Sequence, residues 1–266
     1  MYSCFVGLPV ALLILIFKPS VINLNLGTAL LIVINAIIHL TYLFPYFKSL
    51  HKADASIVIP LFQLIPVFSY FLAFAILGET LSNMQIIASI MIICGAIGIS
   101  IKFEGRKTRL RGDVVMLMLL ASLLVSINFV MFKFFAIDSD FWTVSFWQYI
   151  GFLIFGLIIF LLVKSYRRDF LSSFRKSGKK VISLNVLNES ISVVAGLVFT
   201  YATLLAPVAL VSVINGFQPL FVFLIGLLLT IFVPHIIKED LGKKIILQKV
   251  VFILLMFIGA YLLQSS

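Results

Sequence analysis

The sequence predicts an all-α polytopic membrane protein with nine transmembrane helices, and three observations carry this prediction. Of the 266 residues, 62% are apolar and only 11% are charged, and the mean hydropathy is +1.22, far outside the composition of soluble domains. Long apolar runs recur without the two-residue alternation of a barrel strand. Because the backbone in lipid must satisfy its own hydrogen bonds, such runs have to form helices.

Nine apolar segments reach or approach the length of about 20 residues that a membrane span needs. From the N-terminus they cover residues 2–17, 27–47, 55–77, 84–101, 114–134, 141–163, 183–204, 208–232 and 246–264. The first segment is short and contains Pro9. It is expected to be either a thin span or a helix whose upstream neighbour is absent from this chain.

Basic residues mark one side of the membrane. The net charge is +10, but it lies in short connectors between apolar runs, which argues against nucleic acid as a partner. Of the 20 Lys and Arg residues, only Lys18 and Lys133 lie on the opposite side. By the positive-inside rule, the N-terminus is predicted in the cytoplasm and the C-terminus outside, in a multi-pass protein of the plasma or inner cell membrane.

The longest connector, residues 164–180, mixes basic residues with Phe170, Leu171 and Phe174. This composition fits a contact with anionic lipid or a regulatory segment. The positive-inside bias alone accounts for its charge, however, so a topology anchor at the headgroups is the preferred interpretation.

The chain contains an internal repeat. Sliding residues 53–74 onto 206–227 aligns Ala53 with Ala206, Val58 with Val211, Pro66 with Pro219, and Phe68 with Phe221. Neighbouring segments keep the same order, so the second, third and fourth helices pair with the seventh, eighth and ninth. Partners lie five spans apart and cross in opposite senses, as in inverted-repeat transporters. We therefore predict a four-helix repeat at 1–104, a basic linker at 105–112 and a five-helix repeat at 113–266.

Several short motifs resemble a known family. They are Tyr46, "ADAS" at 53–56, the helix with Pro60 and Pro66, "LGE" at 77–79, and the stretch 201–230 in the second repeat. Together they resemble EamA-type domains of the drug/metabolite transporter superfamily. The resemblance implies a ten-helix secondary carrier for amino acids, amines or drug-like compounds, here without its first helix. Family members usually keep both termini in the cytoplasm, whereas the charge distribution places this C-terminus outside.

Polar side chains form a stripe on the seventh helix. Glu189 lies nine residues past Lys180, or about 13 Å along a helix. Helical spacing gathers the following residues on one face: Asn185, Glu189, Ser192, Gly196, Thr200 and Thr203. A polar stripe in lipid has to face protein or a water-filled cavity. Glu189 is therefore either a proton or cation-substrate site, or a carboxylate that Asn185 or another donor holds for packing.

The paired helices carry similar polar stripes, which predicts one central cavity between the repeats. The expected substrate-binding residues are Asn35, His39, Tyr46, Gln63, Asn185, Glu189, Ser192, Tyr201, Asn215 and Gln218. Some have simpler interpretations: His39 as an interface histidine, the amides as interhelical contacts, and Tyr46 and Tyr201 as part of the aromatic belt. Gly95, Gly98 and Gly259 are expected at close helix contacts.

The sequence thus predicts a secondary transporter of small metabolites that works by alternating access, with proton coupling through Glu189 as a further hypothesis. Its expected partners are a small-molecule substrate and the lipid bilayer, as a monomer or a homodimer. A non-transporting or degenerate membrane subunit is the alternative. A channel or membrane-embedded enzyme is disfavoured, because the spans contain neither a continuous polar lining nor paired catalytic carboxylates or HExxH. No cofactor or metal is expected.

Overall fold

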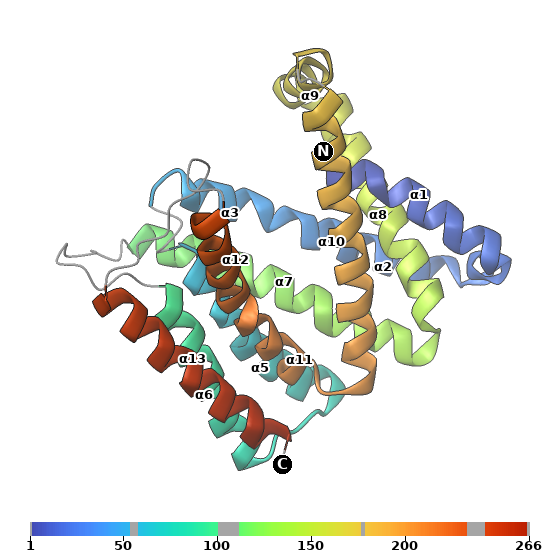
Figure 1. The fold of residues 1–266 in the computed structure, drawn as a ribbon. Coiled ribbons are helices and arrows are strands. Elements are labelled where there is room, and N and C mark those ends of the chain that lie inside the picture. Colours follow the sequence, from blue (N-terminus) through green and yellow to red (C-terminus); the bar gives the residue numbers. More distant parts are fainter. Residues whose placement is uncertain (1, 54–57, 101–111, 177–178, 233–242, 265–266) are drawn as a thin grey trace. The chain divides into compact units, whose positions relative to one another are not determined.

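The computed structural model describes residues 2–53, 58–100, 112–176, 179–232 and 243–264. Every regular element in these ranges is helical (Figure 1). The α-helices are α1 (Tyr2–Phe17), α2 (Leu26–Thr41), α3 (Leu43–Leu50), α5 (Ile65–Leu77), α6 (Asn83–Ser100), α7 (Gly112–Asp138), α8 (Phe141–Leu162), α9 (Lys164–Lys176), α10 (Lys179–Leu205), α11 (Val208–Ile214), α12 (Gln218–Phe232) and α13 (Lys243–Gln264). Three 3₁₀-helices accompany them, η1 (Pro19–Asn23), η2 (Ile59–Leu64) and η3 (Asn215–Phe217).

Seven helical stretches in the described part of the chain are long and apolar enough to cross a membrane. They are Leu26–Leu50, Ile59–Leu77, Gly112–Asp138, Phe141–Leu162, Val181–Leu205, Val208–Thr230 and Ile245–Leu263. Two shorter apolar helices, Cys4–Phe17 and Asn83–Ile99, occupy the positions of the first and fourth predicted spans. The prediction of an all-helical polytopic protein is confirmed, whereas the count of nine spans is not.

Two spans are interrupted at prolines. The third predicted span begins as η2, with Pro60 in its first turn, and continues as α5, with Pro66 in its first turn. The eighth runs as α11, then η3, then α12, which starts at Gln218 and Pro219. Proline lacks the N–H of an internal helical bond, and in both spans a 3₁₀ turn ends just before Pro66 or Pro219. These two breaks therefore follow directly from the sequence.

The helices group into two compact units. The first contains residues 1–41 and 127–206, and the second contains residues 42–126 and 207–266. Helix α7 is continuous and belongs to both. Each unit takes segments from both predicted repeats, so the units and the repeats divide the chain differently. The repeat boundaries at residues 104 and 113 remain a prediction.

In the first unit, α8 packs along α1 and α2. A buried cluster forms around Ile32 of α2, Phe132 of α7 and Val144 of α8. The indole nitrogen of Trp147 donates to the carbonyl of Val21, 3.0 Å away, and ties α8 to η1. The chain before α8 is held by an ion pair between Lys18 and Asp140, with the two charged atoms 2.8 Å apart.

In the second unit, α6 and α13 make a close backbone contact. A Cβ atom added at Gly95 would lie 2.3 Å from Cγ of Met256, and one at Gly98 would lie 2.3 Å from the ring of Phe252. One added at Gly259 would lie 2.9 Å from the carbonyl oxygen of Ala88. The expectation that these glycines mark close helix contacts is confirmed.

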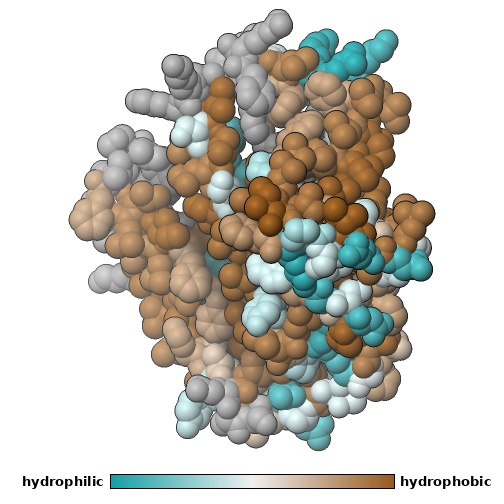
Figure 2. All heavy atoms as spheres, turned by 90° about the vertical axis from the view of Figure 1, so that its right-hand side faces the viewer, coloured by the Kyte–Doolittle hydropathy of each residue, from teal (hydrophilic) through white to brown (hydrophobic). Residues whose placement is uncertain are grey.

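Large apolar side chains remain exposed on many helices, including Phe17, Leu162, Leu205 and Phe232. Figure 2 shows hydrophobic residues over much of the face in view. In water such a surface would drive association, whereas lipid tails solvate it. The surface agrees with the composition in placing these helices in a membrane.

Candidate functional site

In the second unit, the two proline-broken spans meet at their 3₁₀ turns. Gln63 of η2 is buried, and its Oε1 atom would lie 3.3 Å from a Cβ atom built on Gly216 of η3. Glycine at position 216 therefore lets the backbone approach the Gln63 amide. Farther along, the hydroxyl of Ser212 in α11 lies 3.4 Å from that of Ser69 in α5. The third and eighth predicted spans are thus brought together at their interruptions.

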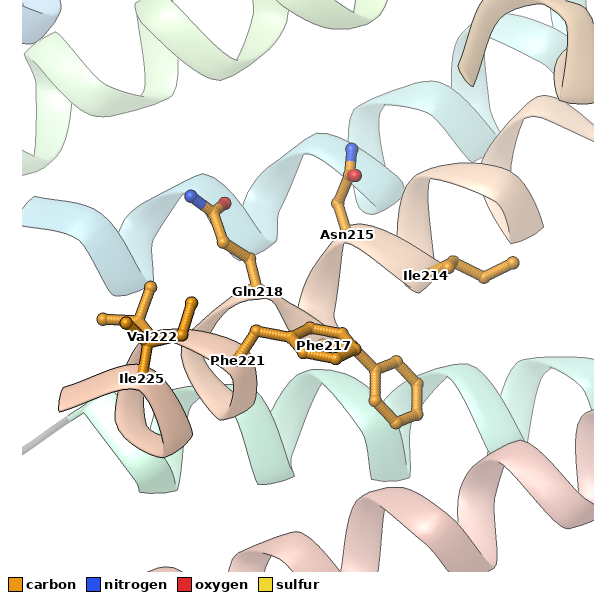
Figure 3. Close-up of a pocket in the computed structure, with 7 residues that line it drawn as sticks. All are labelled: Ile214, Asn215, Phe217, Gln218, Phe221, Val222 and Ile225. Carbon is orange, nitrogen blue, oxygen red and sulfur yellow. The ribbon is translucent and has the colours of Figure 1, made fainter. Parts of the chain in front are cut away.

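The broken span of α11, η3 and α12 forms an open hollow of about 480 Å³. Its lining residues are Ile214, Asn215, Phe217, Gln218, Phe221, Val222 and Ile225. Figure 3 shows the amide groups of Asn215 and Gln218 pointing to the same side of the helix. None of the seven lining residues is charged. The hollow can therefore offer two neutral amides and aromatic surface to a ligand.

A carboxylate holds the start of this broken span. Glu79 follows α5, and its Oε2 atom accepts a 2.8 Å hydrogen bond from the backbone N–H of Val208, the first residue of α11. The first N–H groups of a helix have no partner within it, and a carboxylate also complements the helix dipole there. Glu79 consequently connects the end of α5 to the beginning of α11.

Glu189 lies in the first unit, at the partly buried edge of α10. One and two turns farther on, Val193 and Leu197 pack against the cluster formed by α1, η1 and α8. Glu189 precedes Val193 by one turn, so it lies on the side of α10 that packs toward α1. Asn185 is partly buried, whereas Ser192 is exposed and donates to the carbonyl of Asn188. The predicted polar stripe is therefore partly buried at Asn185 and Glu189, exposed at Ser192 and Gly196, and buried again at Thr200 and Thr203.

His39 lies on the packed side of α2. Its ring is stacked on Phe152 of α8, with centroids 5.8 Å apart, and is tilted against Phe129 of α7 at 6.3 Å. This environment is aromatic on two sides. It fits an interface histidine as well as the predicted substrate contact.

One turn from His39, four buried polar residues come from three helices. Asn35 of α2 donates from its amide nitrogen to the carbonyl of Asn128 in α7, at 3.4 Å. Ser145 and Gln148 lie on α8, and all four residues are more than 90% buried. Asn35 follows Ile32 by one turn, Gln148 follows Val144 by one turn, and Asn128 precedes Phe132 by one turn. Because Ile32, Phe132 and Val144 form one cluster, the polar residues share the next layer of the same interface.

This layer contains polar atoms that have no hydrogen-bond partner within the described residues. They are Asn35 Oδ1, Asn128 Nδ2, Ser145 Oγ and Gln148 Oε1. Buried groups of this kind are rare and usually bind water or a ligand. The sequence analysis selected Asn35 but missed the other three. The spacing of Ser145 and Gln148, three residues apart within an apolar span, was the signal that could have found them.

The two predicted tyrosines lie in different units. The ring of Tyr46 lies 5.0 Å from that of Phe62, beside the buried cluster of Val58, Val114 and Met118. Tyr201 is 51% exposed, and its ring contacts Phe141 edge-on at 5.3 Å. In the second unit, Gln63 therefore lies beside η3, which contains Asn215 and directly precedes Gln218. The first unit contains the other predicted site residues: Asn35, His39, Asn185, Glu189, Ser192 and Tyr201. A single cavity shared by all of them remains a prediction.

These features define a class: a polytopic, all-helical membrane protein with proline-broken spans. Residues 1–101 match the model of the EamA-like transporter family. This match confirms the resemblance noted in the sequence over these residues, which are 101 of the 266 in the chain.

Nineteen solved chains share this fold significantly. One of them is described only as the crystal structure of a protein. It has a TM-score of 0.70 and 15% sequence identity to this chain. The alignment covers 98% of this chain and 84% of the other. At this identity the likeness concerns the fold alone. No curated protein matches the sequence significantly.

Proposed function

We propose that the protein is a secondary-active transporter of small metabolites that works by alternating access. The observation that carries the proposal is the meeting of the η2 and η3 breaks at Gln63 and Gly216. Secondary carriers with inverted repeats place their substrate sites beside interrupted helices, where unwound backbone and polar side chains can serve a ligand. Here the two interrupted spans are the ones that the sequence repeat pairs.

The hollow supports amino acids, amines or drug-like compounds as substrate classes. Its amides, on Asn215 and Gln218, can donate and accept hydrogen bonds, and Phe217 and Phe221 supply apolar surface. Glu189, an acid within a predicted span, is the proposed proton or cation-substrate site, since intramembrane carboxylates commonly mark such pathways. Gln63, His39 and Tyr46 remain proposed substrate-binding residues on the paired helices.

The proposal is tested with the full-length chain reconstituted in liposomes. Uptake of a labelled amino-acid mixture and of a labelled organic amine is measured with and without an imposed proton gradient. Asn215→Leu is expected to lower uptake at least about tenfold, because a site that hydrogen-bonds its substrate discriminates strongly when a partner is lost. The matched control is Asn83→Leu, which changes an exposed asparagine at the first residue of α6.

Equal uptake by Asn215→Leu and wild type would contradict the role of the hollow. Uptake that did not respond to the proton gradient would exclude proton coupling while leaving transport intact. A chain that moved none of the probes, although folded and correctly inserted, would favour the alternative of a non-transporting membrane subunit.

A further inference from the structure

Helix α9 lies between two candidate membrane spans. It comprises Lys164–Lys176 and is separated from the end of α8 at Leu162 by Val163 alone. The next candidate span begins at Val181. In Figure 1, α9 forms the turn between the ends of α8 and α10. Because both neighbours are candidate spans, α9 is tethered where they leave the bilayer. A connector that serves only as a topology anchor needs positive charge but no ordered helix.

An aromatic contact fixes one side of α9. The ring of Phe170 is stacked on Phe5 of α1, with centroids 5.5 Å apart, and meets Phe160 of α8 edge-on at 6.3 Å. Phe5 and Phe160 also contact each other edge-on at 6.3 Å. The three rings therefore form a closed set that joins α9 to α1 and α8 and determines which side of α9 remains outward.

The outward side combines positive charge with apolar surface. Lys164, Arg167, Arg168 and Leu171 follow one another at steps of three, one and three residues, which places them on one helical face. Lys164 is exposed, the side chain of Arg168 is 82% exposed, and Leu171 is 46% exposed. Tyr166 is 47% exposed but lies on the opposite side of the helix from this face, because it follows Lys164 by two residues.

The acidic neighbour does not neutralise this face. Asp169 approaches Arg168 at 3.8 Å, but both side chains are more than 70% exposed. An ion pair of this kind in water contributes little. Three cations consequently remain available against one acid over residues 164–172.

We propose that the face of Lys164, Arg167, Arg168 and Leu171 binds the phosphate headgroups of anionic lipids in the leaflet where α8 and α10 end. Amphipathic helices with this composition lie in the interface, with cations at the phosphates and apolar side chains at the acyl boundary. The charge of the face complements an anionic surface, which attracts basic residues within a Debye length. The contact would hold α9 flat against the membrane and is independent of the proposed transport function.

The test uses the full-length chain in nanodiscs, with Cys4 and Cys94 replaced by serine and Leu171→Cys labelled with an environment-sensitive dye. Quenching by acrylamide, which is uncharged, reports exposure of the dye to water. We expect quenching at least about 2-fold lower in discs with about one-third phosphatidylglycerol than in pure phosphatidylcholine, because each basic residue near an anionic surface adds to the attraction. The difference should disappear at high salt.

Two variants and two controls decide the outcome. The triple variant K164Q/R167Q/R168Q should lose the difference between the lipids, whereas Asp169→Asn should keep or enlarge it. A dye on Leu162→Cys, at the end of α8, should be equally protected in both discs. Inorganic phosphate, added at matched ionic strength to discs of pure phosphatidylcholine, should not protect the dye on Leu171→Cys from acrylamide. Equal quenching in both lipids, or equal protection by free phosphate, would overturn the proposal.

Discussion

Helices α7 and α10 are both 27 residues long and both carry polar side chains, yet they are buried very differently. In the most apolar window of α7, 44% of the residues are buried, whereas the corresponding share in α10 is zero. The main site residue predicted from the sequence, Glu189, lies on α10, and none of the predicted site residues lies on α7. The comparison shows that polar spacing identifies a face of a helix but not what that face meets.

The polar groups of α7 serve the broken span beside it. Ser126 Oγ lies 3.0 Å from the carbonyl of Ile65, and Ser122 Oγ lies 3.4 Å from that of Leu61. Hydroxyls of this kind satisfy backbone groups near a proline-induced interruption. Ser126 Oγ also lies 2.8 Å from the carbonyl of Ser122 in its own helix. In α10, the hydroxyls of Ser190 and Ser192 donate to carbonyls of α10. The hydroxyls of Ser122 and Ser126 therefore connect α7 to the neighbouring span, whereas those of Ser190 and Ser192 bond within α10.

The largest expected difference is in stability. Ser126→Leu puts a larger side chain into a fully buried position and removes the contact with Ile65. Overpacking of this kind costs about 1–3 kcal/mol, and the lost hydrogen bond adds to it. The matched change on α10, Ser192→Leu, should stay within about 0.5 kcal/mol because the site is exposed. Chemical unfolding in detergent micelles measures both. Equal costs in the two variants would remove the structural distinction between the helices.

The next effect concerns transport, and here the large effect is expected on α10. Glu189→Gln keeps the shape of the side chain but cannot ionise, and we expect uptake to fall at least about tenfold, equivalent to about 1.4 kcal/mol in the barrier. Asn188→Gln, on an exposed neighbouring position, is the control. Flux is measured in the same liposomes at several pH values. An unimpaired Glu189→Gln variant would assign Glu189 to helix packing.

A third variant examines the buried polar layer that α7 shares with α2 and α8. Gln148→Leu removes an acceptor that has no partner within the described residues. Burying an unsatisfied polar group costs about 1–3 kcal/mol, so leucine should leave stability unchanged or raise it by about 1 kcal/mol. Thermal unfolding measures the change, with Gln85→Leu in a partly exposed position as control. A stable Gln148→Leu variant that had lost transport would instead make this layer a ligand site.

The smallest effect is expected at the turn between α7 and α8. Asp140 accepts hydrogen bonds from the N–H groups of Trp142 and Thr143 as the N-cap of α8, and it pairs with Lys18. Partial burial by itself would raise the pKa of Asp140, but the hydrogen bonds from Lys18 and Thr143 and the positive charge of Lys18 outweigh it and lower the pKa below 3.8. The charged form is therefore favoured in the folded protein.

Because the pKa of Asp140 is lower in the folded state than in the unfolded state, its contribution to folding stability is complete at pH values above the pKa of the unfolded state. This contribution to stability is lost as the pH falls through the pKa of the folded state. Asp140→Asn should lower the free energy of unfolding by at most about 1 kcal/mol at neutral pH, since asparagine is also a good N-cap. The variant should also lose less stability than the wild type as the pH falls. Asp138→Asn, an exposed neighbour, is the control for pH-dependent unfolding.

The sequence was sufficient to predict the long apolar helices, whereas helix α9 lies in a segment that was predicted as a connector. Apolar length locates the spans, and Pro60, Pro66 and Pro219 mark the breaks, because proline acts locally. The amides of Asn215 and Gln218 were also selected, because helical spacing places Asn215 on a polar stripe of the eighth predicted span, with Gln218 one position off it. The sequence pattern could not predict which segments each helix face contacts, because these contacts depend on packing between segments far apart in the chain. Asn128 and Gln148 were missed for this reason, as was the attachment of α9 through Phe170.

The close contact of α6 with α13 has a mechanical consequence. Side chains at positions 95, 98 and 259 would collide with the neighbouring helix, so their absence lets the backbones approach as near as atoms permit. Sliding either helix by one residue would drive a larger side chain into that space. The two helices are therefore expected to move together as one rigid body, and the proline-interrupted segments are the expected places for a shape change in the second unit.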